Sequence, residues 1–222
     1  MPIVLTPLTP SPTASAYTRQ NLIDDAIVYL KRSDLAASVP TFLRLAEARI
    51  ARELRLRMQL VSTTLQTVAG SGDIDLPEGL LELKAIAYTD WWRLDIGSLE
   101  QVYAARQYPP VESRATVYAV QGSTLALAPV PSAAVDISIT YYAKFDILTN
   151  PDDTNWLLTN HPSVYLFAVL AEAQPFMLDD DRTALWEAKY AADREALKTS
   201  DQRAAYSGAS MELGSLHTQA IV

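Results

Sequence analysis

Histidines and clustered acidic residues are the side chains of this sequence best suited to chemistry. The two histidines, His161 and His217, lie far apart, and neither has a second histidine nearby. A metal site needs several converging His, Cys or carboxylate ligands, so this spacing favours a capping or solvent-exposed role for each histidine. The chain has no cysteine, which excludes thiolate metal ligands, thiol nucleophiles and disulfides.

A run of three aspartates, Asp179–Asp181, raises the alternative of a Ca²⁺ or Mg²⁺ loop. The spacing of an EF-hand loop, with its glycine and distant glutamate, is missing. Acidic residues are favoured at helix N-termini because the free N–H groups there are positive, so we interpret the run as a helix cap. A nucleophile elbow and a P-loop are also missing. The sequence therefore predicts no catalytic, cofactor-binding or metal-binding residue, and leaves open only a carboxylate pair brought together by the fold.

Arginines gather on a helix predicted over about residues 40–58. They lie beside an apolar stripe that includes Leu43 and Ile50, and they are Arg44, Arg49, Arg52, Arg55 and Arg57. In one interpretation the pairs Arg49–Glu53 and Glu53–Arg57 stabilise a solvated helix by about 0.2–0.5 kcal/mol each. In the other, Arg44, Arg49, Arg52 and Arg55 bind a partner. A protein partner is preferred to DNA because the net charge of the chain is −8.

The adjacent tryptophans Trp91 and Trp92 are a second candidate for partner binding. Neighbouring residues of a strand point to opposite faces, so both rings are buried only if both faces are covered. Tryptophan is a common anchor at subunit contacts. We therefore expect one ring in the core and the other at an interface, or a covered loop at this position.

Hydrophobic periodicity predicts helices at both ends of the chain and strands between them. Helices are expected over about residues 18–32 and 40–58, and again from Asn155 to about residue 200, where Asn160 or Ser163 caps an almost wholly apolar helix. Alternation predicts strands near residues 61–65, 74–76, 116–120, 124–128 and 135–142, with residues 69–73 as a hairpin turn and a short helix at 98–106. Residues 79–96 fit either a strand or a helix.

The expected fold class is α+β, a helical bundle with two N-terminal and two C-terminal helices that carries an inserted small antiparallel β domain and extended termini. The expected units are a Pro-rich arm at residues 1–16, the bundle at 17–60 and 150–200, the β domain at 61–149 and a tail at 201–222. The tail has scattered apolar residues and is expected to become ordered on a partner through Met211, Leu213, Leu216 and Ile221.

The sequence shows no targeting or membrane signal. No run approaches the roughly 20 apolar residues of a membrane span. The N-terminus lacks the basic region of a signal peptide. A soluble protein made in a reducing cytoplasm is therefore expected.

The order of these segments resembles the head-to-tail adaptor, or connector, proteins of tailed bacteriophages, including the tubular tail protein A type. The likeness covers about residues 17–200. It rests on a helix pair, NLIDDAIVYLKR and PTFLRLAEARIARELR, on DIDLPEGLLELKAI, on VYAVQGSTLALAPVP followed by VDISITYYAKFDIL, and on NWLLTNHPSVYLFAVLAEAQPFMLDDDRTALWEAKYAADREAL. No single motif is strict, and the order of the segments carries the specificity.

The resemblance implies a structural protein of the virion neck or tail, made in the host cytoplasm, without enzymatic activity or cofactor. Such adaptors form a ring, usually dodecameric, beneath the portal protein. They extend the DNA channel and present a platform for the tail nozzle or tail fibres, and their C-terminal segment folds against the portal. Genomic DNA passes through the channel without specific binding, and the acidic composition of this chain suits that passage.

Two other function classes stay open from the sequence. A tail-associated peptidoglycan hydrolase needs two carboxylates about 5–10 Å apart in a cleft. A cytoplasmic binding or regulatory module is the other alternative, although the acidic charge weighs against a version that binds nucleic acid.

Overall fold

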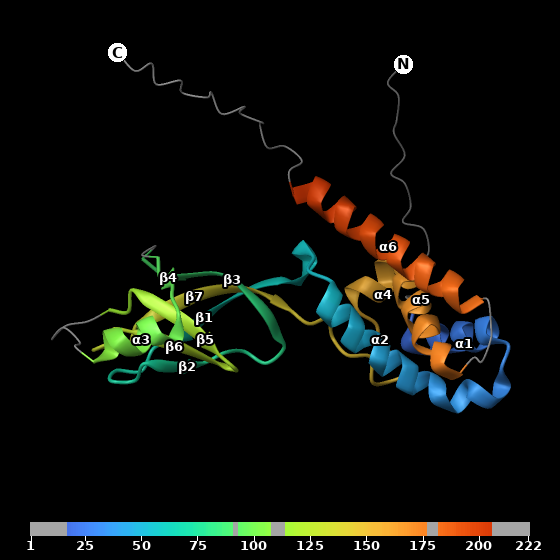
Figure 1. The fold of residues 1–222 in the computed structure, drawn as a ribbon, viewed down its shortest axis with the longest axis horizontal. Coiled ribbons are helices and arrows are strands. Elements are labelled where there is room, and N and C mark those ends of the chain that lie inside the picture. The colour runs from blue at the N-terminus through green and yellow to red at the C-terminus, as the bar shows by residue number, and fades with distance from the viewer. Residues whose placement is uncertain (1–16, 91–92, 108–113, 177–181, 206–222) are drawn as a thin grey trace, which may run out of the picture.

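The helical and β regions form two neighbouring parts of the molecule (Figure 1). The computed structural model describes residues 17–90, 93–107, 114–176 and 182–205. The helical part contains α1 (Arg19–Leu30), α2 (Val39–Glu53), α4 (Trp156–Asn160), α5 (Pro162–Glu172) and α6 (Arg182–Ala205), with 3-10 turns at Ser33–Ser38, Arg57–Gln59 and Gln174–Phe176. The β part contains seven strands, β1 to β7, and α3 among the described residues. The expected α+β class is confirmed.

Helix α5 lies at the centre of the helical part and packs against α1, α2, α4 and α6. Its apolar residues are buried around most of its circumference, as in Val164, Ala168 and Leu170. This is the behaviour expected of a helix that is apolar on all sides. The apolar stripe predicted around Leu43 and Ile50 of α2 is buried in the same core as the inner residues of α6. The buried residues of these two helices include Leu43, Ala46, Ile50, Leu54, Trp186, Tyr190 and Leu197.

Local capping signals account for several helix starts. The side chain of Thr18 accepts from the N–H of Asn21 at the start of α1, and the side chain of Ser98 accepts from the N–H of Gln101 at the start of α3 (Leu99–Arg106). The predicted caps Asn160 and Ser163 were wrong. The chain breaks into α4 and α5 at His161 instead, and the side chain of Asn155 caps α4 by accepting from Leu158.

The strands form two sheets that share one apolar core. The first sheet has the order β1-β7-β3, from β1 (Leu60–Gln66), β7 (Asp136–Ala143) and β3 (Leu80–Tyr88). The second has the order β2-β6-β5-β4, from β2 (Asp73–Asp75), β6 (Thr124–Ala128), β5 (Val117–Gln121) and β4 (Asp95–Ile96). Side chains from both sheets meet in the core, including Ile137, Ile139 and Leu125. Helix α3 covers the other face of the second sheet through Val102.

Two expectations for the β part are corrected. The hairpin predicted at residues 69–73 does not form, because β1 pairs with β7 and β2 pairs with β6 in the other sheet. The register places Thr63 opposite Ile139 and Leu65 opposite Ile137, so a distant strand with matching alternation is the partner of β1. The β part is also not purely antiparallel, since β4 and β5 are parallel. The ambiguous segment contains strand β3.

The hairpin between β5 and β6 forms as predicted. Gly122 has φ of 61° in the turn between Gln121 and Thr124, a conformation that glycine adopts without strain. The resulting register pairs Tyr118 with Leu127 and places both side chains in the shared core. Side chains of β5, β6 and β7 supply most of the buried apolar core between the two sheets.

Candidate partner-binding surface

Helix α2 divides its side chains among three environments. Its buried stripe faces α5, and Arg49 and Glu53 lie half-buried beside that stripe. The remaining face is exposed and carries Arg44, Leu45, Ala48 and Arg52. Leu45 is 47% exposed, although it is a large apolar side chain on a helix with a well-filled core. We call these four residues the basic α2 face.

Arg49, one of the predicted partner-binding residues, makes its ion pairs within the subunit. Its guanidinium donates to Glu187 of α6 at 2.9 and 2.5 Å and to Glu53 of α2 at 3.1 Å, and it lies 3.5 Å from Glu172 of α5. It also lies 4.5 Å from the centre of the Tyr190 ring. These contacts join three helices, so Arg49 contributes to the closure of the bundle.

Glu53 is the second centre of this cluster. It accepts from Arg194 at 2.5 Å and from the hydroxyl of Tyr190 at 2.9 Å, besides its bond from Arg49. Desolvation raises the pKa of Glu53, but the hydrogen bonds from Arg194, Tyr190 and Arg49 together lower it below its ordinary value. The carboxyl is therefore charged at neutral pH, which is unlike the raised pKa of a general acid.

Arg55 and Arg57 bind residues that lie outside α2. Arg55 donates to the carbonyl oxygens of Ala51 and Leu54 and forms a 3.2 Å ion pair with Glu82 of β3. The predicted pair of Glu53 with Arg57 does not form, because α2 ends at Glu53. Arg57 binds Asp201 near the end of α6 instead, through its backbone N–H at 3.1 Å and its Nε at 3.2 Å.

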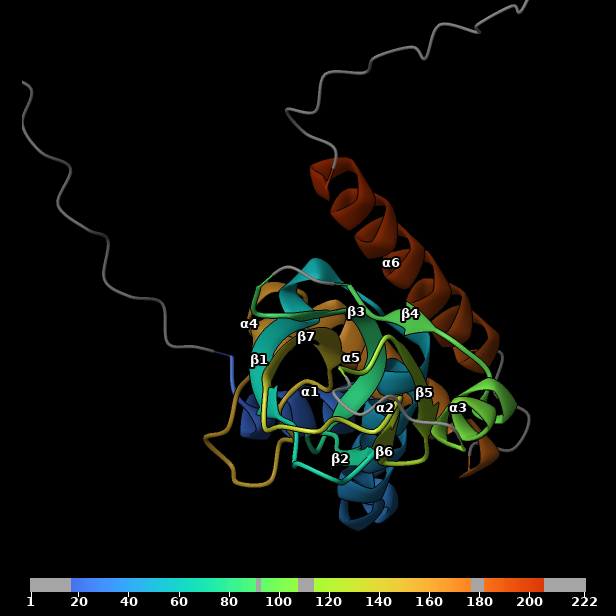
Figure 2. The ribbon, with the colours of Figure 1, turned by 90° about the vertical axis from the view of Figure 1, so that its left-hand side faces the viewer.

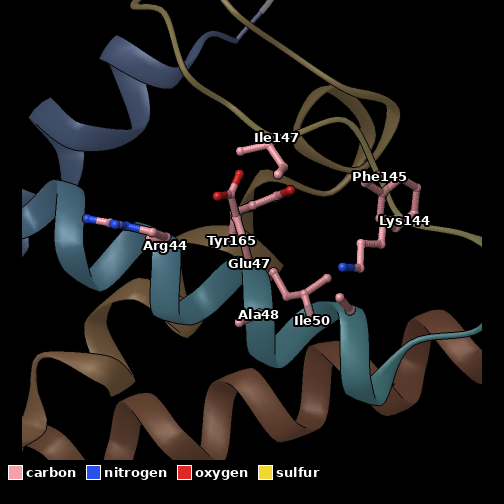
Figure 3. A pocket seen from close by; sticks show the side chains of 9 residues that line it. Arg44, Glu47, Ala48, Ile50, Lys144, Phe145, Ile147 and Tyr165 are labelled. Atoms are coloured by element: carbon pink, nitrogen blue, oxygen red, sulfur yellow. The ribbon is translucent and has the colours of Figure 1, made fainter. Parts of the chain in front are cut away.

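A cavity of about 250 Å³ lies between α2 and the segment that returns from β7 (Figure 3). Glu47, Ile50, Phe145, Ile147 and Tyr165 are among the residues that line it. Burial raises the pKa of Glu47, and the N–H of Leu148, which donates to its Oε1 at 2.9 Å, partly offsets this. The guanidinium of Arg44 points away from Tyr165 along α2. The cavity is mainly apolar and its one carboxylate is already hydrogen-bonded.

Helix α1 carries a face of the opposite charge. Asp24, Asp25, Val28 and Tyr29 are all exposed, and the last two are 69% and 48% exposed. The inner face of this helix is formed by Leu22, Ile23, Ala26 and Leu30. We call the four exposed residues the acidic α1 face. It pairs two carboxylates with two uncovered apolar side chains.

The remaining predicted residues are placed as follows. His161 lies at the joint of α4 and α5, with its ring 5.4 Å from that of Trp156. His217, the aspartate run 179–181 and the predicted partner-binding residues Trp91, Trp92, Met211, Leu213, Leu216 and Ile221 lie outside the described residues. No three His, Asp or Glu side chains within the described ranges gather closely enough to hold a metal ion. None of the described helices combines the length and apolar character needed to cross a bilayer.

Sequence reasoning missed the partners of Arg49 and the two exposed helix faces. Glu187 and Glu172 come from distant helices, and periodicity does not show which helices become neighbours. The exposed apolar residue of α2 was detectable from the sequence, because Leu45 lies outside the stripe formed by Leu43 and Ile50. Together with the exposed Arg44 and Arg52, it makes this face of α2 a candidate for a contact outside the subunit.

Comparison with known families agrees with a structural protein built from a helical bundle and a β unit. A family model described as SU10 adaptor protein matches residues 17–212. The chain belongs to the SU10 adaptor protein family. This confirms the resemblance to phage head-to-tail adaptors and supports a structural role as a phage adaptor. The narrower likeness to the tubular tail protein A type stays a prediction, and comparison with curated proteins finds no significant match.

Proposed function

We propose that this chain is a non-enzymatic head-to-tail adaptor of the virion. It forms a ring, dodecameric by resemblance, beneath the portal, extends the DNA channel and supports the tail nozzle or fibres. The observation that carries this proposal is the family match over residues 17–212. The net charge of −8 agrees with a channel through which DNA passes without specific binding.

Two helix faces have the complementarity that a ring contact needs. The basic α2 face presents Arg44 and Arg52 beside Leu45, and the acidic α1 face presents Asp24 and Asp25 beside Val28 and Tyr29. Two different surfaces that bind each other between copies make a head-to-tail contact, and such contacts form a ring when the rotation from one subunit to the next closes. In this proposal the acidic α1 face of one subunit lies against the basic α2 face of the next.

Other contacts are proposed from the sequence. The C-terminal residues Met211, Leu213, Leu216 and Ile221 anchor the subunit to the portal, and Trp91 or Trp92 contacts a neighbouring protein. A segment with scattered apolar residues is ordered by its partner, which delays stable attachment until the portal is present. Arg55 stays a candidate for partner contact alongside its bond to Glu82.

We also infer that the two parts are separate domains, with the bundle at residues 17–60 and 150–200 and the β domain at 61–149. Each part has its own cluster of buried apolar residues. A non-enzymatic role agrees with the state of the carboxylates around Arg49, since Glu53, Glu172 and Glu187 are all within ion-pair distance of that guanidinium.

The ring contact is tested by reversing charge on one face and then on the other. The double variant Arg44→Glu/Arg52→Glu is expected to prevent ring formation with the portal, as measured by sedimentation velocity and electron microscopy. Combining it with Asp24→Lys/Asp25→Lys is expected to restore rings, because both faces are then inverted together. Lys84→Glu, at an exposed position of β3, is the control for a change of net charge.

The outcomes separate the parts of the proposal. Rings that form equally well in all these variants contradict the α1–α2 contact but keep the adaptor role. A wild-type chain that stays monomeric with the portal contradicts the adaptor ring itself.

A further inference from the structure

The edges of the two sheets differ in how they are protected against pairing with another chain. Edge strands expose unpaired N–H and C=O groups, and proteins block them with short length, bulges, charges or proline. Strands β2 and β4 are short and carry Asp73, Asp75 and Asp95. Strand β3 has two register irregularities, the charged residues Glu82 and Lys84, and an isolated bridge to Arg93.

Strand β1 has none of these protections. Its seven residues, LVSTTLQ, include no charge and no proline, and it pairs with β7 in continuous register. Within the part of the chain that the structure describes, no strand pairs with its other side. Figure 2 shows β1 at the outer side of its sheet. Among the described edges, this long, uncharged one is suited to receive another strand.

Apolar surface beside this edge is also incompletely covered. Val61 and Leu65 lie on the side of the sheet that faces the shared core, because they pair with Tyr141 and Ile137. Val61 is nevertheless 41% exposed, and Leu65 is half-buried. A strand added along β1 would place alternate side chains over these two residues and extend the core.

The N-terminal segment of the chain has the composition to occupy this edge. Residues 1–16 contain no charged side chain, and Ile3–Thr6 is a proline-free stretch, IVLT, of high β propensity. The segment joins the described structure at Tyr17, whose carbonyl accepts from Thr154 at 3.0 Å. Asn155 and Trp156, which follow Thr154 in the chain, line a groove of about 260 Å³ together with Val61 at the start of β1.

The length of the connection is sufficient to reach an adjacent copy. Residues 7–16 contain Pro7, Pro10 and Pro12, and a polyproline-type spacer of that length spans about 31 Å. A seven-residue strand is only about 23 Å long. A fully extended spacer is therefore longer than β1, so this length allows Ile3–Thr6 to reach an adjacent copy.

We propose that residues Ile3–Thr6 of one subunit pair as an added strand with the free edge of β1 in the next subunit. This inference rests on the proposed ring. It assigns the N-terminal arm an interlocking role that is separate from the contact between the helix faces. The recognition is chemically simple, since an uncharged extended segment meets an uncharged edge and apolar side chains cover Val61 and Leu65.

The absence of native cysteine permits a direct cross-linking test. Chains with Ser62→Cys are mixed with chains carrying Val4→Cys or Leu5→Cys, and rings are assembled on the portal. A disulfide-linked dimer is expected with one of the two arm positions and much less with the other, because neighbouring strand residues point to opposite faces. Val61→Lys is expected to abolish the cross-link. Val120→Lys is the matched control, since Val120 is 43% exposed on the inner strand β5.

Each other result overturns the inference. Cross-linking confined to one chain in the double variant Val4→Cys/Ser62→Cys identifies the subunit's own arm as the occupant. Dimers formed by Ser62→Cys alone identify a second β1. If rings form but no cross-link appears, the N-terminal segment does not pair with β1, and the proposed ring is still supported. Failure of the wild type to form rings contradicts the proposed function, and this inference falls with it.

Discussion

The interior of the helical part is closed by ion pairs within the subunit, whereas the β part leaves one strand edge open. In the helical part, Arg49 and Arg194 bind carboxylates from α2, α5 and α6 around a continuous apolar core. In the β part, no strand within the described ranges pairs with the outer side of β1, and Val61 is partly uncovered beside that edge. The charges of the Arg49 cluster are thus satisfied within the subunit, whereas the β1 edge keeps backbone groups that no described strand pairs with.

This difference suits the two regions to different kinds of contact between subunits. A closed bundle keeps a fixed shape, which allows its outer helix faces to present charges at set positions. An open sheet edge gains backbone hydrogen bonds and apolar cover only from another chain. The helical part is therefore suited to align subunits and the β part to tie them together, as proposed above.

The largest expected effect tests whether the two regions are separate folding units. Leu170→Ala, at a fully buried position of α5, is expected to destabilise the helical part by about 2–5 kcal/mol through lost burial and a cavity. Its matched counterpart is Leu127→Ala, at a fully buried position of the β core. In urea unfolding, helical circular dichroism should shift with the first variant and stay nearly unchanged with the second. If both variants shift the same single unfolding transition, the two cores fold together.

A smaller effect is expected at the connection between the regions. Gln59 is buried, accepts from the N–H of Leu56 and donates to the carbonyl of Ala143 in β7. Gln59→Ala leaves both groups without this partner and is expected to cost about 1–3 kcal/mol. Gln66→Ala, which removes a surface hydrogen bond to Asp136, is the control. If both variants unfold at the same urea concentration as the wild type, Gln59 does not hold the two regions together.

The smallest effects are expected at Glu47 and Glu53 of α2, whose pKa values are shifted in opposite directions. The pKa of Glu53 is lowered, so its carboxylate stabilises the fold above the ordinary value of 4.5, and this is lost as pH falls through the folded-state pKa. Glu53→Gln is expected to cost about 1–2 kcal/mol at neutral pH and little in acid. The pKa of Glu47 is raised by burial, so Glu47→Gln is expected to gain slight stability at neutral pH, and the gain should vanish below 4.5.

The measurement is thermal unfolding of both glutamate variants and the wild type from neutral to acidic pH. The exposed Glu78→Gln is the control and should leave the melting temperature nearly unchanged. Two variants that move in the same direction at neutral pH would contradict the assigned environments of Glu47 and Glu53.

Much of the fold follows from local patterns in the sequence. The buried stripe of α2, the wholly apolar α5 and the hairpin around Gly122 each depend on residues close in the chain, and each was predicted. Pairing of β1 depends instead on β7, which is distant in sequence. A turn-like segment at residues 69–73 favoured the wrong local partner, since period-two alternation identifies a strand without identifying its neighbour.

The candidate surface was only partly accessible from sequence for the same reason. Composition located the arginines of α2 but did not separate Arg49, which reaches Glu187 of α6, from Arg44 and Arg52, which remain exposed. That separation depends on how α5 and α6 pack against α2. The acidic α1 face was missed because Val28 and Tyr29 continue the apolar pattern of their helix and only tertiary packing leaves them uncovered.

The bond between Arg57 and Asp201 has a mechanical consequence. Asp201 lies near the end of α6, and Arg57 lies in the short turn that leads directly into β1. A force applied to the C-terminal segment therefore loads the backbone at the joint of the two regions as well as the helix itself.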